Sequence, residues 1–174
     1  MNKKKQVGFL KWPMYILFAL LLFCIQYSPT KLGVFDGAML ILPFIVTLCC
    51  FEEIIPSVIT CVGFGFLWDY SGGHLFGFRA FMLCVIGLCV CLAIKLYVRP
   101  VFVSVMAAVA IATIVYIIAE FFFFYVIKGY SSLFTLFINN YIWAFFKTVL
   151  WGTLISYLTM KIYKLKPQKS LVDM

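Results

Sequence analysis

The chain has 174 residues, of which 66% are hydrophobic and only 11% are charged. A water-soluble domain of this size carries a much richer charged surface, so the composition excludes an ordinary soluble protein and predicts an integral membrane protein. The net charge of +8 does not indicate a nucleic-acid partner, because lysines gather at the two ends of the chain. Lysines that flank apolar runs are typical of tails kept in the cytoplasm, where they also meet anionic lipid headgroups.

The apolar residues form about six runs, each near the roughly 20 residues that a helix needs to cross a bilayer. In chain order, the predicted spans cover about 13–28, 36–51, 54–70, 80–98, 101–126 and 141–163. Proline suits the first turn of a helix, so Pro13 sets the expected start of the first span. The basic start of the chain resembles a signal peptide, but no small-residue cleavage site follows, and we expect an uncleaved first span. The predicted fold is therefore all-α: one domain over 1–174, a compact bundle of about six transmembrane helices.

The distribution of basic residues predicts the orientation of this bundle. With six spans both termini lie on one side, and that side holds Lys3, Lys4, Lys5, Lys11, Lys95, Arg99, Lys161, Lys164, Lys166 and Lys169. The opposite loops hold only Lys31, Arg79 and Lys128, while Lys147 falls within a span. By the positive-inside rule, both termini face the cytoplasm.

Two ionisable residues fall inside predicted spans, where each needs a partner or a purpose. Glu120 lies about six residues before the outer end of the fifth span, and Lys147 about six residues after the outer start of the sixth. At about 1.5 Å per residue, both lie roughly 9 Å below the outer surface. We therefore predict a Glu120–Lys147 ion pair between neighbouring helices, with helix packing favoured over ligand binding as its role.

Small residues recur at helical spacing in two spans. Ser57, Cys61, Gly65 and Asp69 share one face of the third span, and such a face lets another helix approach closely. Asp69 stands about ten residues before Arg79, across a glycine-rich loop, which predicts a bridge that closes the loop rather than a substrate contact. A second face of the fifth span carries Ala108 and Ala112 and continues through Tyr116 to Glu120.

The sequence carries no catalytic or cofactor motif that we can identify. It lacks a phosphate-binding loop and a His-Glu-x-x-His zinc motif, and its six acidic residues are widely spread. The seven cysteines lie in apolar runs, where cysteine behaves as a small hydrophobe. His74, the single histidine, cannot build a multi-histidine metal site. We expect no enzyme activity, no metal and no cofactor.

One segment resembles a known family. Gly63-Phe64-Gly65-Phe66-Leu67-Trp68-Asp69, followed by Gly72-Gly73-His74-Leu75-Phe76-Gly77-Phe78-Arg79, is similar to the segment shared by the MreD family of rod-shape proteins. Ala119-Glu120-Phe121, the basic amino terminus, the length and the lysine-rich end also resemble that family. The chain departs from the family pattern at Phe76, a bulky residue inserted before Gly77, and this departure concerns the geometry of the loop.

The resemblance implies a non-enzymatic membrane scaffold of the bacterial cell-elongation machinery. Such a protein acts with MreC and helps to link MreB filaments to RodA and a class B penicillin-binding transpeptidase. The family fold is thought to be similar to that of substrate-binding S-components of energy-coupling-factor vitamin transporters. That class is the alternative function, with Asp69, His74, Arg79, Glu120 and Lys147 as possible ligand contacts. Against it, the first span has only one alanine, Ala19, and lacks the Ala-x-x-x-Ala face typical of S-components. The small-residue faces would dock partner helices or, as we favour, the protein's own.

Overall fold

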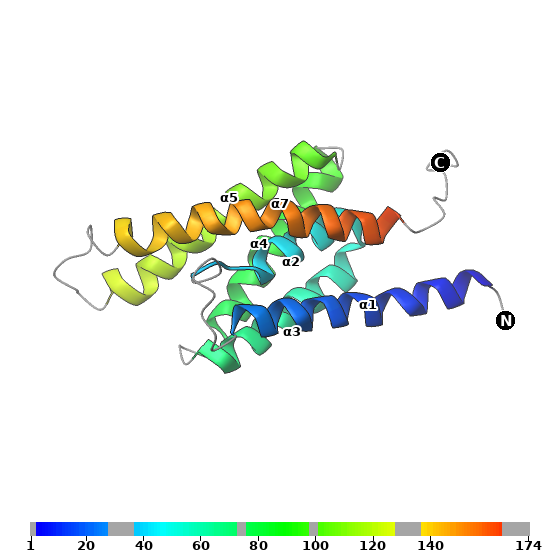
Figure 1. The fold of residues 1–174 in the computed structure, drawn as a ribbon, viewed down its shortest axis with the longest axis horizontal. Helices are drawn as coiled ribbons and strands as arrows, with labels where there is room; N and C mark the ends of the chain where they lie inside the picture. The colour runs from blue at the N-terminus through cyan, green and yellow to red at the C-terminus, as the bar shows by residue number, and fades with distance from the viewer. Residues whose placement is uncertain (1–2, 28–36, 73–75, 98–100, 128–136, 165–174) are drawn as a thin grey trace.

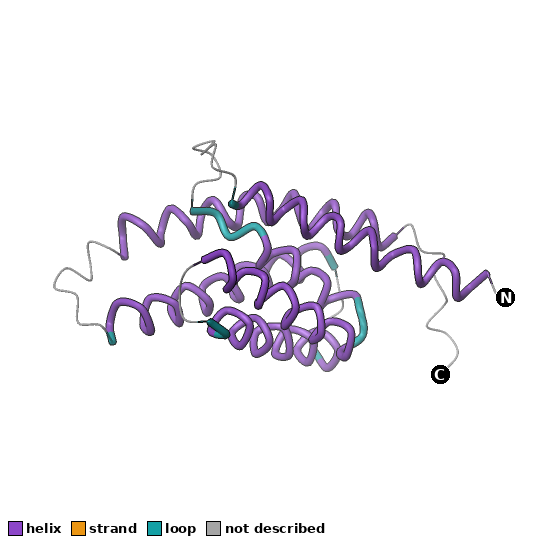
Figure 2. The backbone as a smooth tube through the Cα atoms, turned by 90° about the horizontal axis from the view of Figure 1, so that it is seen from below, coloured by secondary structure: helices purple, strands orange, loops and turns teal. Residues whose placement is uncertain are grey.

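A computed structural model of the chain describes residues 3–27, 37–72, 76–97, 101–127 and 137–164. All regular secondary structure in these ranges is helical (Figures 1 and 2), which confirms the all-α prediction. The helices are α1 (Lys3–Gln26), α2 (Ile41–Phe51), α3 (Ile54–Gly72), α4 (Phe78–Leu96), α5 (Phe102–Phe121) and α7 (Trp143–Lys164). Short π-helical turns, η1 (Phe122–Val126) and η2 (Phe137–Ile142), extend the facing ends of α5 and α7.

The prediction that the first helix begins at Pro13 is wrong. Helix α1 begins at Lys3 and carries Pro13 in its interior. A proline inside a helix removes one backbone hydrogen bond and its ring crowds the carbonyl four residues earlier, which destabilises or kinks the helix but does not always end it. The apolar part of α1 does start at Pro13, so the sequence located the apolar run but not the helix end.

Helix α2 starts at Ile41, later than the predicted 36. Gly37 has a positive φ of 78°, and the chain from there to residue 40 is not helical. Side chains of other helices satisfy this stretch: the Met39 N–H donates to Thr148 Oγ1 at 2.9 Å, and the Ile41 N–H donates to Gln26 Oε1 at 3.3 Å. Non-helical backbone of this kind is tolerated where other helices surround it.

Helix α2 is the core of the bundle. Each of its residues from Ile41 to Cys50 is buried, and the helix contacts α1, α3, α4, α5 and α7. Around it, α3 and α4 form one closely packed hairpin, α5 packs beside α7, and α1 lies at the edge (Figure 1). The first turn of α1 and the last turn of α7 lie at the same end of the molecule (Figures 1 and 2).

Two described helical stretches are long and apolar enough to cross a membrane, Phe78–Leu96 and Phe102–Val126. Only 39% and 33% of their most apolar windows are buried, whereas the core helix of a soluble protein is mostly buried. Other helices also expose large apolar side chains: Leu17 is 70% exposed, Ile55 74% and Leu150 66%. An apolar surface of this extent indicates a membrane protein, because it is unfavourable in water.

Candidate functional site

The site begins with Asp69, a buried acid near the end of α3 that holds the start of α4. Its carboxylate accepts three backbone hydrogen bonds, from the N–H groups of Gly77 at 2.9 Å, Arg79 at 3.1 Å and Ala80 at 3.2 Å. The first N–H groups of a helix lack partners within the helix, and a negative charge there is also favoured by the helix dipole. Asp69 therefore caps α4 from a different helix.

Gly77 makes this capping possible. It precedes the first residue of α4 with φ at 95°, in the left-handed region that favours glycine. The predicted Asp69–Arg79 salt bridge is wrong. The Asp69 carboxylate accepts from the main-chain N–H of Arg79, whereas the Arg79 guanidinium pairs with Glu120. Gly73 and His74, also named from the sequence, lie outside the described residues.

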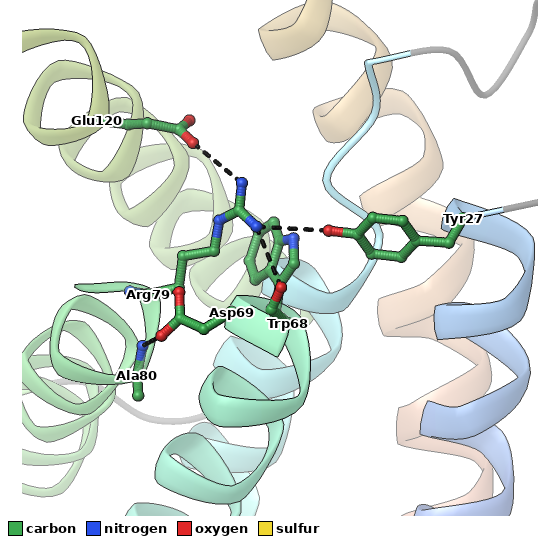
Figure 3. A network of polar contacts seen from close by, with 6 residues as sticks. All are labelled: Tyr27, Trp68, Asp69, Arg79, Ala80 and Glu120. Carbon is green, nitrogen blue, oxygen red and sulfur yellow. Dashed lines mark hydrogen bonds and ion pairs between the residues drawn. The ribbon is translucent and has the colours of Figure 1, made fainter. Parts of the chain in front are cut away.

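The Arg79 side chain joins four helices (Figure 3). It leaves the first turn of α4, and its Nη2 lies 3.6 Å from Glu120 Oε1 on α5. Its Nη1 donates to the Trp68 carbonyl of α3 at 3.1 Å and to the hydroxyl of Tyr27, the residue after α1, at 3.5 Å. The guanidinium carbon also lies 5.1 Å from the centre of the Trp68 ring, within cation–π range. Both charged side chains of the Arg79–Glu120 pair are about nine-tenths buried.

The predicted Glu120–Lys147 pair is wrong, because Arg79 is the partner of Glu120. Helix α7 turns Ala144 and Thr148 into the core, and this rotation leaves Lys147 half-buried to one side. The sequence argument compared depths along the two helix axes. It had no information on rotation about those axes, which decides whether two side chains at one depth can meet.

Aromatic side chains surround the ion pair. The Tyr116 ring, one turn before Glu120, stacks on Trp68 with centroids 5.4 Å apart and an interplanar angle of 10°. Sequence reasoning placed Tyr116 on the Glu120 face but assigned no role to Tyr27 or Trp68. The available signal for Trp68 was its position next to Asp69, and for Tyr27 its hydroxyl at the end of an apolar run.

The small-residue face of α3 packs against α4. Ser57, Cys61 and Gly65 are buried like Asp69, and a Cβ added at Gly65 would overlap the backbone of Ala80. On α4, a Cβ added at Gly87 would lie 2.5 Å from the Cys61 sulfur. The prediction that the protein's own helices cover this face is therefore confirmed.

The second predicted face, on α5, is also turned inward. Ala112 is buried with Tyr116 and Glu120, and Ala108 is half-buried against the same core. The face thus continues to the ion pair as the sequence predicted. It packs within the bundle, as α5 contacts α2, α4 and α7.

Three thiols meet where α2, α3 and α4 approach one another. The sulfurs of Cys49 and Cys61 are 3.6 Å apart, and the Cys91 thiol donates to the Cys49 carbonyl at 3.4 Å. All seven cysteines are free thiols. Within the described part of the chain, no three histidine, cysteine or acidic side chains are grouped so that they could hold a metal ion.

In the polar cluster of Asp69, Arg79 and Glu120, the backbone N–H groups at the start of α4 stabilise the Asp69 carboxylate, and the Arg79 guanidinium pairs with Glu120. The evident capacity of this cluster is to fasten helices together. Comparison of the chain with protein-family models, curated proteins and solved structures finds no match.

Proposed function

We propose that the chain is a non-enzymatic scaffold of the bacterial cell-elongation complex. In this role it binds MreC and helps to couple MreB filaments to peptidoglycan synthesis by RodA and a class B transpeptidase. One observation carries the proposal: Asp69, Gly77, Arg79 and Glu120, which carry the resemblance to the MreD family, converge in one buried cluster. These residues are far apart in the sequence and yet meet in the fold. Their meeting supports an architecture shared with the MreD family better than a match between short apolar segments does.

The proposal includes about six membrane spans, with both termini in the cytoplasm. The ends of α1 and α7 lie at one end of the molecule, which fits an even number of crossings. Lysines are concentrated at that end, with Lys3, Lys4 and Lys5 in the first turn of α1 and Lys161 and Lys164 in the last turn of α7. Helix α2 has 11 residues, about half of a full span, and would lie inside the bundle as a half-helix continued by the irregular chain before it.

A scaffold role also suits the distribution of polar and apolar groups. The charged residues of the cluster face one another, so they hold the bundle in one arrangement. The outer faces of the helices remain available to partner helices and lipid, with exposed side chains such as Leu17 and Leu21 on α1 and Ile55 and Ile59 on α3. Under the alternative transporter function, Arg79 and Glu120 would need to release each other to contact a vitamin.

The test is co-purification from native membranes. A tagged copy is extracted in mild detergent, and its partners are identified by mass spectrometry, with an unrelated multi-pass protein at equal abundance as the control. Recovery of MreC, RodA or the transpeptidase above the control supports the proposal. Recovery of a transmembrane coupling subunit with two ATPases contradicts it and supports the transporter function.

The topology has its own test. A fluorescent protein that folds only in the cytoplasm is fused after Met174, and alkaline phosphatase is inserted between residues 128 and 136. The proposal predicts fluorescence from the first fusion and phosphatase activity from the second. The opposite pair of results would contradict the proposed orientation.

A further inference from the structure

In the described part of the chain, exposed tyrosine and tryptophan side chains lie near the ends of helices. Tyr70, near the end of α3, is 87% exposed, and Tyr97, directly after α4, is 86% exposed. The other exposed residues of these two types in that part are Tyr27 after α1, Trp143 at the start of α7 and Tyr157 in its last third. Each side chain has an apolar ring and a polar atom, so it suits a boundary between apolar and aqueous surroundings.

Tyr27 and Tyr70 lie at the level of the first turn of α4. The Tyr27 hydroxyl accepts a hydrogen bond from Arg79, which belongs to that turn. Tyr70 directly follows Asp69, whose carboxylate accepts from the N–H groups at the start of the same helix. Residues that follow α1 and end α3 are therefore brought to one level of the bundle.

Trp143 lies near the same level on the other side of the bundle. It comes two residues after Tyr141, whose ring meets that of Phe121 with centroids 5.6 Å apart. Phe121 directly follows Glu120, the ion-pair partner of Arg79 on α5. The start of α7 and the end of α5 are thus joined where the ion pair lies.

Tyr97 marks the opposite end of α4. This helix has 19 residues, so at 1.5 Å per residue its ends are about 28 Å apart, close to the roughly 30 Å of the hydrocarbon core of a bilayer. Between residues 85 and 96, the large exposed side chains of α4 are all aliphatic: Val85, Leu88, Leu92 and Leu96. An aliphatic band with tyrosine at both of its ends is typical of a membrane span.

We propose that the exposed tyrosine and tryptophan side chains bind the two headgroup regions of a phospholipid bilayer: one region contacts Tyr27, Tyr70 and Trp143, and the other contacts Tyr97 and Tyr157. The aliphatic surface of α4 lies in hydrocarbon between them. The Arg79–Glu120 pair is then at the level of an interface, and a charged group is most costly at the bilayer centre. This inference rests on the proposed membrane insertion, but it depends neither on MreC nor on which side of the membrane is cytoplasmic.

The first test places a tryptophan at three depths, with Tyr70→Trp, Tyr97→Trp and, as the matched mid-helix control, Leu88→Trp. The whole chain is reconstituted in phosphatidylcholine vesicles whose lipids carry bromine, a contact quencher of tryptophan fluorescence, either near the headgroup or near the end of the acyl chain. The signal of the wild type, with its native tryptophans, is subtracted. We expect headgroup-side bromine to cause the greater loss of fluorescence at positions 70 and 97, and chain-end bromine the greater loss at position 88.

Equal profiles at the three positions would overturn the proposal. So would a failure of every brominated lipid to quench positions 70 and 97, because those side chains would then face water or another protein chain. Bromine in both leaflets makes the result independent of orientation, and vesicles with the purified chain alone make it independent of scaffold partners. The result therefore stands apart from the outcome of co-purification with MreC.

Bilayer thickness provides a second measurement, on the unaltered chain. We expect the highest unfolding temperature in phosphatidylcholine vesicles whose hydrocarbon core is about 30 Å thick, and lower values in thinner and thicker bilayers, because hydrophobic mismatch is unfavourable. An unfolding temperature that does not change with thickness would contradict the proposed boundaries.

Discussion

The α3–α4 hairpin is held together in two different ways along its length. Near the loop, Asp69 caps α4 and Arg79 reaches the carbonyl of Trp68, so directional contacts join the helices. Further along, Gly65 lies against Ala80 and Gly87 against Cys61, so the helices are joined by close approach. The polar region determines which groups meet, and the small-residue region determines how near the axes come. Substitutions in the first region should therefore act through lost partners, and in the second through added volume.

The largest effect is expected from Arg79→Met. This change leaves the Glu120 carboxylate buried without its partner and removes the contacts to Trp68 and Tyr27, so we expect a loss of about 3–5 kcal/mol in unfolding free energy. The thermal midpoint in detergent and the yield of folded protein measure it. A midpoint equal to that of the wild type would contradict the assignment of Arg79 as the partner of Glu120.

In the small-residue region, Gly65→Ala is expected to cost about 1–3 kcal/mol, because the new methyl group must push α3 away from the backbone of Ala80. Gly63→Ala, two residues earlier on the same helix, is the matched control. A Cβ there meets nothing within 4 Å, so this change should be neutral or slightly stabilising. Thermal unfolding of both variants gives the comparison, and similar midpoints would show that the helices do not approach closely at Gly65.

A third effect concerns the backbone alone. Gly77→Ala introduces a Cβ that meets no neighbour within 4 Å but must adopt a positive φ, at a cost of about 1–2 kcal/mol. The N–H groups at the start of α4 would then be less well placed to donate to the Asp69 carboxylate, and the thermal midpoint should fall. A midpoint equal to that of the wild type would mean that residue 77 does not need the left-handed conformation.

The smallest effect is expected from Tyr27→Phe, about 0.5–1.5 kcal/mol, since the hydroxyl accepts one 3.5 Å hydrogen bond from Arg79. Unfolding in detergent again measures it. A loss as large as that of Arg79→Met would mean that α1 is fixed to the bundle mainly through this contact. Helix α1 would then have to be compared as a third region, beside the polar and small-residue regions of the α3–α4 hairpin.

The sequence predicted the helices well because apolar runs and their breaks are local properties. The starts and ends of α3, α4, α5 and α7 lie within a few residues of the predicted spans. The start of α2 was missed because the bonds that stabilise the irregular chain before it come from Gln26 and Thr148, which are distant in sequence.

The candidate site was predicted in part. Helical spacing placed Asp69 on the packed face of α3 and Glu120 on the buried face of α5, and both positions hold. The pairing of charges was not predicted correctly, because Arg79 was assigned to Asp69 and Glu120 to Lys147. Helical periodicity gives the face of a residue relative to its own helix, but only the packed bundle decides which faces meet.

A double-mutant cycle on Arg79→Met and Glu120→Leu tests the central claim most directly, that this buried pair fastens α4 to α5. Each single change should destabilise the protein, because it leaves one buried charge without its partner. The double variant, with neither charge, should be more stable than the sum of the single effects predicts, by about 2 kcal/mol or more. Strictly additive effects would contradict the Arg79–Glu120 pairing. If, in addition, a second cycle showed coupling between Glu120 and Lys147, then Lys147 would be the partner of Glu120, as the sequence suggested.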